Sequence, residues 1–155
     1  MNDAYLSIGS NIGNRLDNIK KSVILLKENN INILQQSSIY ITEPKGYKKQ
    51  NYFYNAVLLI STKLSVDDFF TLTKKIELIL GKKNNKLPNR PRIIDIDLLT
   101  FGSDIINSSK LTIPHPRLNK RKFVLVPWQE INSSFMVPVF NKTVFNLLNG
   151  VEDSS

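Results

Sequence analysis

The sequence predicts one α+β domain, a mainly antiparallel sheet with helices packed on it, and three observations lead to this class. Stretches of alternating or β-branched residues are interleaved with two stretches of helical periodicity. The chain has 155 residues, 41% of them hydrophobic, which is enough for one core and too little for two comfortable ones. No linker rich in Pro, Ser or Gly divides it. We therefore expect a single domain over residues 1–155, loosely ordered from about residue 150 onward.

The first half of the chain predicts a strand, a helix and two more strands. Polar and apolar residues alternate over residues 4–8, which predicts a strand ending at Gly9. Apolar residues recur every three or four positions over residues 15–28, which indicates an amphipathic helix. Residues 31–41 are β-branched and polar by turns, and residues 52–61 are strongly apolar and aromatic. We expect these two stretches to be antiparallel strands joined by a long loop.

A second helix and a further strand follow. Ser65, three residues before Asp68, is typical of a helix N-cap, and Gly81 supplies the stop at the other end. A strand is expected from Arg92 to Phe101. The order strand, helix, strand, strand, helix, strand is that of the ferredoxin-like βαββαβ plait, in which both helices lie on one face of the sheet.

The last third of the chain predicts only short elements. Short strands are expected near residues 105–106 and 135–139, and short helices near residues 126–131 and 143–148. We expect these elements to extend the sheet or to cap its open face.

Positive charge is concentrated in one part of the chain. The net charge is +8, and residues 82–122 hold ten basic residues against three acids. Such a surface attracts phosphate-rich partners, either a polynucleotide or a small polyphosphate such as ATP. The alternative for any single lysine is a solvated surface position, whereas the arginines of this segment are stronger candidates for binding phosphate.

Several classes of protein are excluded. With no cysteine, the chain has no disulfide framework, no thiolate zinc site and no cysteine nucleophile. The longest apolar stretch, residues 56–60, is far shorter than the roughly 20 residues of a membrane-spanning helix. The Gly-x-x-x-x-Gly-Lys-Ser/Thr motif is absent, which excludes a P-loop enzyme. We expect a cytoplasmic protein without a secretory segment or a membrane partner.

Two acidic residues on the last long strand are the first candidates for chemistry. Asp95 and Asp97 are two positions apart, so they share one face of the strand while the apolar residues beside them go to the core. Carboxylates held so close repel each other unless a cation is present, and Mg²⁺ prefers such hard oxygen ligands. The alternative is that both are ordinary solvent-facing residues of an edge strand.

Four further side chains could build an ATP site without a P-loop. Arg92, Lys110 and Arg121 are cationic, and His115 lies between two prolines that restrict its backbone. A lone histidine is more often structural than catalytic, so the residue type leaves both roles open for His115.

Three other side chains would suit a flat heterocycle with a hydrogen-bonding edge. Phe53 and Asn55 share one face of their strand, and Phe123 follows the basic segment. Most aromatic residues at such positions belong to the core, and the residues alone leave this choice open as well.

Four separate motifs occur in a fixed order along most of the chain. They are AYLSIGSN at residues 4–11, Tyr52-x-x-Asn55-Ala56, Arg92-x-x-Asp95-Ile96-Asp97-Leu98-Leu99, and Pro114-His115-Pro116-Arg117-x-x-x-Arg121-x-Phe123-Val124-Leu125. On these motifs the chain resembles the 6-hydroxymethyl-7,8-dihydropterin pyrophosphokinase family of folate biosynthesis, whose ferredoxin-like fold agrees with the predicted order of elements.

The resemblance implies that ATP gives its β,γ-diphosphate to the hydroxymethyl group of the dihydropterin, with release of AMP. It implies that Asp95 and Asp97 hold two Mg²⁺ ions, with Arg92 and Lys82 as further catalytic residues. ATP and 6-hydroxymethyl-7,8-dihydropterin would then be the partners of a monomer that binds no nucleic acid. The expected ATP-binding residues are Glu77, Lys82, Arg92, Lys110, Thr112, His115 and Arg121, and the expected pterin-binding residues are Thr42, Phe53, Asn55 and Phe123.

One segment departs from the family pattern, and one alternative function comes from another class. Residues 82–91 carry lysines where the family usually has arginines, and lysine lacks the planar fork of arginine. The alternative is an RNA-binding module of the RRM type that uses the basic surface of residues 82–122. The K/R-G-F/Y pattern of that module does not occur in the chain, which makes this alternative the weaker one.

Overall fold

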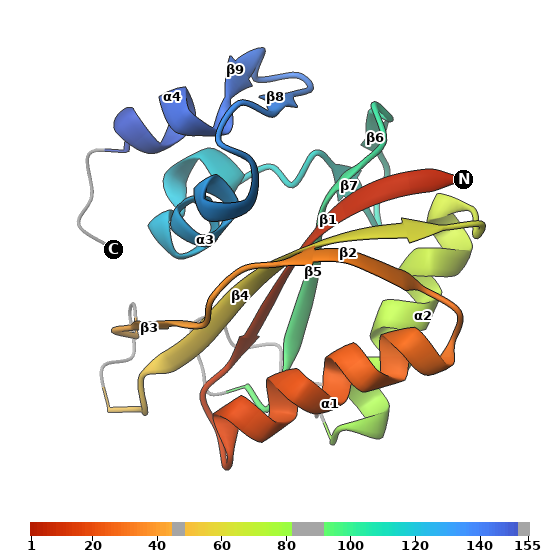
Figure 1. Ribbon diagram of the computed structural model, residues 1–155, viewed down its shortest axis with the longest axis vertical. Coiled ribbons are helices and arrows are strands. Elements are labelled where there is room, and N and C mark those ends of the chain that lie inside the picture. Colours follow the sequence, from red (N-terminus) through yellow and green to blue (C-terminus); the bar gives the residue numbers. More distant parts are fainter. Residues whose placement is uncertain (45–48, 82–91, 152–155) are drawn as a thin grey trace.

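The computed structural model describes residues 1–44, 49–81 and 92–151 and is built around one antiparallel sheet. Its strands are ordered β2-β4-β1-β5, and the short β3 pairs with β4 beside β2 (Figure 1). This is the strand order of the ferredoxin-like plait, which confirms the predicted fold. The strands span β1 Asn2–Ser10, β2 Asn32–Gln36, β3 Tyr40–Thr42, β4 Phe53–Thr62 and β5 Asp95–Phe101.

Two helices cover one face of this sheet, as expected from their periodicity. They are α1 (Arg15–Glu28) and α2 (Val66–Ile79), and their apolar sides pack on the apolar residues of β1, β4 and β5. The Ser65 side chain accepts a hydrogen bond from the amide of Asp68, as the N-cap prediction required. Gly81 has φ of 96°, a left-handed conformation that favours glycine after a helix.

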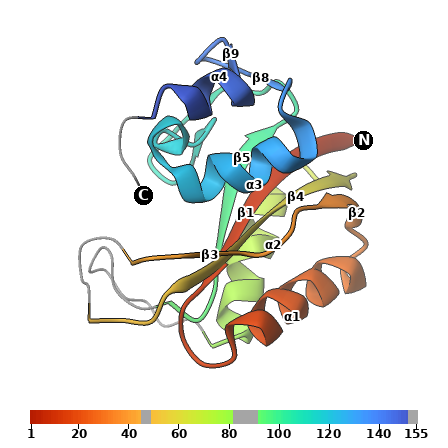
Figure 2. The same ribbon diagram turned by 60° about the vertical axis from the view of Figure 1, so that its left-hand side comes forward.

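The opposite face of the sheet is covered by the C-terminal part of the chain (Figure 2). Tyr5, Val57 and Leu99 point to this side from three strands and pack with Leu125 and Trp128 in a second core. The helices on this face are α3 (Lys122–Asn132) and α4 (Val144–Asn149), and a single 3₁₀ turn, η1 (Leu118–Lys120), precedes α3. The expectation that the C-terminal elements cap the open face is therefore confirmed.

The other alternative, that these elements extend the sheet, does not hold for the described residues. The short strands form two separate pairs, β6 (Ile106–Asn107) with β7 (Thr112–Ile113) and β8 (Met136–Val137) with β9 (Lys142–Thr143). The first helix of this region also begins at Lys122 instead of near residue 126. Proline favours the first turn of a helix, which is why the sequence predicted a start near residue 126. In the structure Pro127 lies inside α3 instead.

The strand predicted over residues 31–41 is divided in two. The amide of Ser37 donates to the carbonyl of Val57, but the amide of Val57 donates to the Ser37 side-chain oxygen, at 2.9 Å each. A side chain thus takes the place of the backbone carbonyl in the ladder, and regular pairing resumes only at Tyr40. The predicted strand from Arg92 likewise begins later, at Asp95.

None of the helices in the described residues combines the length and the apolar character needed to span a bilayer.

The packing of α2 against the sheet predicts a stability difference between two isoleucines on this helix. Ile76 is fully buried under the sheet, whereas Ile79 is 57% exposed. Ile76→Ala should lower the free energy of unfolding in urea by about 2–5 kcal/mol, because it leaves a cavity in the core. The matched variant Ile79→Ala should change it by less than about 0.5 kcal/mol. Equal losses in the two variants would contradict the assignment of the buried face.

Candidate functional site

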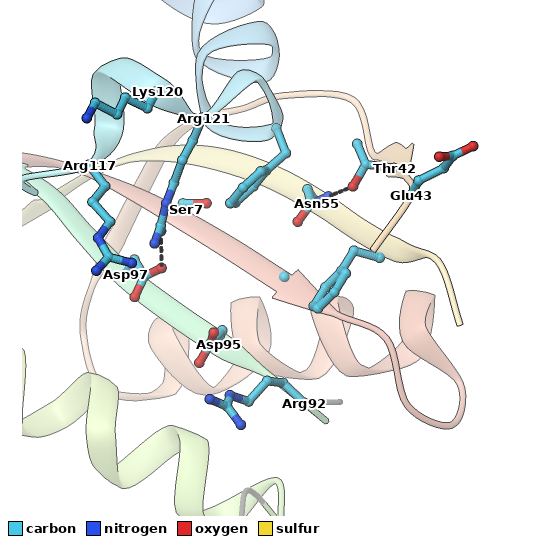
Figure 3. Close-up of a pocket in the computed structure, with 13 residues that line it drawn as sticks. Ser7, Thr42, Glu43, Asn55, Arg92, Asp95, Asp97, Arg117, Lys120 and Arg121 are labelled. Carbon is cyan, nitrogen blue, oxygen red and sulfur yellow. Dashed lines mark hydrogen bonds and ion pairs between the residues drawn. The ribbon is translucent and has the colours of Figure 1, made fainter. Parts of the chain in front are cut away.

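A cavity of about 430 Å³ opens where β1, β4 and β5 meet the segment that leads into α3. Figure 3 shows its lining side chains. The structure brings together eight of the residues that the sequence predicted for the site. These are Thr42, Phe53, Asn55, Arg92, Asp95, Asp97, Arg121 and Phe123.

The carboxylates of Asp95 and Asp97 lie on the cavity side of β5. Ile94 and Ile96, their alternating neighbours, are buried in the core under α1 and α2, as the two-residue period of a strand requires. Burial, and after it the charge of Asp95, raise the pKa of Asp97 to about 6. Two like charges are therefore held together on one strand.

Cationic side chains surround this carboxylate pair. The Arg121 guanidinium lies 3.8 Å from Asp97, and its charge partly offsets the rise in the Asp97 pKa. In Figure 3, Arg117 and Arg121 approach Asp97 from one side of the cavity, and Arg92 lies at the end of the strand near Asp95. Such a mixture of carboxylates and guanidinium groups can bind a phosphate chain together with a cation.

The other half of the cavity is built from aromatic and amide groups. Asn55 is buried in β4, and its amide donates a 2.8 Å hydrogen bond to the Thr42 hydroxyl on β3. Phe53 on β4 and Phe123 in the first turn of α3 also line the cavity, and the Arg121 guanidinium lies 5.5 Å from the Phe123 ring. Two rings with a fixed amide between them can hold a planar heterocycle by stacking and hydrogen bonding.

Gly9 forms part of the cavity floor, on β1 opposite Asn55. A Cβ at this position would lie 2.9 Å from the Asn55 side-chain oxygen, too close for an undisturbed contact. A larger residue here would therefore displace the Asn55 amide.

His115 lies beside the site and does not line the cavity. Its Nδ1 accepts a 3.2 Å hydrogen bond from the amide of Arg117, which assigns the proton of the neutral ring to Nε2. Burial, together with the charges of Arg121 and Arg117, lowers its pKa to about 4. At neutral pH the ring is uncharged and offers one N–H donor.

Three other predicted ATP-binding residues also lie outside the cavity lining. Glu77 is buried on α2, where its carboxylate accepts a 2.7 Å hydrogen bond from the amide of Ile96 on β5. Thr112 is half-buried at the start of β7, and Lys110 is exposed just before it. Lys82 lies outside the described residues.

Sequence reasoning missed five residues that line the cavity, namely Ser7, Gly9, Glu43, Arg117 and Lys120. Ser7 faces Asp97 across β1 and β5, and strand register is not readable from one sequence. Arg117 and Lys120 belong to the basic segment, so their charge was a signal. Arg117 also belongs to the motif that starts at Pro114, although no role was assigned to it, whereas no pattern distinguished Lys120 from other cations there.

Comparison with known proteins finds one family for most of the chain. A family model described as 7,8-dihydro-6-hydroxymethylpterin-pyrophosphokinase (HPPK) matches residues 5–133. A 2-amino-4-hydroxy-6-hydroxymethyldihydropteridine pyrophosphokinase of Bacillus subtilis is 39% identical over 131 residues, which cover 84% of this chain and 78% of that protein. A folate synthesis bifunctional protein of Arabidopsis thaliana is 39% identical over 125 residues, or 81% of this chain.

Several of the relatives are much longer than this chain. The match covers 26% of the Arabidopsis protein and 20% of a folic acid synthesis protein of Pneumocystis carinii. Among solved structures, Plasmodium falciparum HPPK-DHPS with pteroate superimposes with a TM-score of 0.76 at 18% identity, covering 96% of this chain and 42% of that one. At this identity the likeness supports the fold.

The raised pKa of Asp97 predicts a pH-dependent stability difference. Because the folded pKa of about 6 exceeds the ordinary value of 3.8, the folded state binds the proton more tightly, and stability falls as pH rises between these values. Without divalent cations, Asp97→Asn should therefore be more stable than the unchanged protein near neutral pH, and this gain should shrink toward about pH 4. Urea unfolding of both proteins near pH 7 and near pH 4 measures this difference in the free energy of unfolding.

The control is Asp104→Asn, which changes an exposed carboxyl in the turn after β5. A gain that stayed constant with pH in Asp97→Asn would show that packing, not the charge, is responsible.

Proposed function

Because the chain belongs to the 7,8-dihydro-6-hydroxymethylpterin-pyrophosphokinase family, we propose that it transfers diphosphate from ATP to 6-hydroxymethyl-7,8-dihydropterin in folate biosynthesis. The products of this reaction are AMP and the pterin diphosphate. The observation that carries the proposal is the division of the cavity into a charged half and an aromatic half. A carboxylate pair ringed by arginines meets a slot formed by two rings and an amide.

The charged half suits the phosphates of ATP. Arg92 and Arg121 supply planar guanidinium groups that can bind phosphate oxygens through two hydrogen bonds each. Lys110, Thr112, His115 and Glu77 would act from outside the cavity lining, with His115 donating from its neutral ring, and Lys82 would be a further ATP-binding residue. Phosphoryl-group transfer relies on such positioning and charge neutralisation.

The residues present fit Mg²⁺ as the cation. Within residues 1–44, 49–81 and 92–151, no group of three or more His, Cys, Asp or Glu is placed to hold a metal ion. Asp95 and Asp97 alone therefore suit an ion that completes its shell with water and substrate phosphates, as Mg²⁺ does. When bound, two Mg²⁺ ions would neutralise charge on the phosphates. Placing the cation beside Asp97 would also lower the pKa of that carboxyl.

The aromatic half suits the pterin. Phe53 and Phe123 would stack on the ring, and the Asn55 amide with the Thr42 hydroxyl would bind its polar edge. The hydroxymethyl group of the pterin would then lie toward the carboxylates, where the diphosphate is received.

The RNA-binding alternative has no comparable support. RRM modules bind bases on the open face of their sheet. In this protein α3 and α4 cover that face, and Tyr5, Val57 and Leu99 are buried beneath them. Monomeric state and cytoplasmic location remain predictions from the sequence.

The experiment that tests the function separates the nucleotide products of a reaction with ATP, Mg²⁺ and the dihydropterin. We expect AMP formation that depends on the pterin. Asp97→Ala should reduce turnover by about two orders of magnitude or more, because it removes a ligand from the charged half. Asp104→Ala is the matched control and should leave turnover unchanged. Near-normal turnover in Asp97→Ala would contradict the role of the carboxylate pair.

Gly9→Ala should act mainly on the pterin. The added methyl displaces the Asn55 side chain from its bond to Thr42, so KM for the pterin should rise by roughly tenfold while KM for ATP changes little. Steady-state kinetics with each substrate varied in turn measures both values. Gly150→Ala, where the nearest atoms to a Cβ are 3.6 Å away, is the control. An unchanged pterin KM would show that Asn55 does not bind the pterin.

A further inference from the structure

A carboxylate outside the cavity joins the helix and the strand that form two of its walls. Glu130 lies on the exposed side of α3, and its oxygens accept hydrogen bonds from the Ser38 amide at 3.0 and 3.1 Å, from the Ser38 hydroxyl at 3.0 Å and from the Tyr40 hydroxyl at 2.7 Å. The hydrogen bond from Tyr40 lowers the pKa of Glu130, as do those from Ser38. The carboxylate is therefore ionised at neutral pH, and all three donors make charge-assisted bonds. We call this arrangement the Glu130 clasp.

The two sides of the clasp are held in very different ways. On one side, α3 is fixed in the second core through Val124, Leu125 and Trp128, all of which are buried. On the other side, β3 has three residues, none of them buried, and among the described strands it pairs only with β4. The helix is the rigid partner, and the clasp sets the position of the strand against it.

Both partners carry cavity residues close to the clasp. Thr42 follows Tyr40 by two residues on β3 and holds the Asn55 amide. Phe123 lies seven residues before Glu130 on α3, which is about 10 Å along a helix. The placement of β3 relative to α3 (Figure 2) therefore affects the placement of Thr42 relative to Phe123, and both of these residues line the cavity.

We propose that Glu130 is a positioning residue that sets the width of the pterin slot by tying β3 to α3. This inference rests on the proposed function for the identity of the ligand. The tie itself rests on the hydrogen bonds of Ser38 and Tyr40. Glu130 does not line the cavity, so its effect on the pterin passes through Thr42 and Asn55.

The test compares Glu130→Gln with Tyr40→Phe, which keeps the ring and removes only the 2.7 Å hydrogen bond. Glu130→Gln should raise KM for the pterin about fivefold and leave KM for ATP within about twofold, and Tyr40→Phe should act in the same direction but less. A merely structural role would lower thermal stability without separating the two substrates. Equal rises in both KM values, or none, would overturn the proposal.

The control is Glu28→Gln, which changes an exposed carboxylate at the end of α1, far from the cavity lining. Amide hydrogen exchange then tests the tie without any assay of activity. Exchange of the amides of residues 38–42 should become faster in Glu130→Gln and stay unchanged in Glu28→Gln. Faster exchange in Glu130→Gln, combined with an unchanged protein that forms no AMP, would refute the proposed function alone. Exchange in Glu130→Gln at the rate of the unchanged protein would overturn the clasp.

Discussion

Repulsion between two carboxylates on one strand is the constraint on which the rest of the site depends. Asp95 and Asp97 cannot turn away from each other, because the residues that alternate with them are locked into the core under α1 and α2. Arg121 offsets part of this repulsion at 3.8 Å, yet the pKa of Asp97 stays raised. The protein thus holds a strained charge distribution that a cation and a phosphate chain would relieve.

The aromatic half of the site depends on the C-terminal helices α3 and α4, which form a layer that a simple βαββαβ plait lacks. α3 contributes Phe123 to the cavity from its first turn, and Leu125 and Trp128 to the core from the turns that follow. Because one helix serves both purposes, the ring is positioned by core packing that is complete before any ligand arrives. β3 has no such anchoring, and the hydrogen bonds to Glu130 supply a local substitute.

Much of the fold could be predicted because its signals are local. Periodicity located α1, α2 and the long strands, and the Ser65 cap and Gly81 marked both ends of α2. The break at Ser37 escaped prediction because it depends on a bond to Val57, twenty residues away. Within the site, Asp95 and Asp97 followed from the two-residue period of a strand. Gly9 did not, since its role arises from register with Asn55 on a neighbouring strand.

Apart from its proposed role toward ATP, Glu77 binds the backbone at the edge of the sheet. Among the described strands β5 is the last on its side of the sheet, so its outward amides are potential pairing sites for a strand of another molecule. The amide of Ile96, in the first half of this strand, is already occupied by the Glu77 carboxylate at 2.7 Å. A side chain from α2 therefore removes one pairing site from the edge of the strand that carries both aspartates.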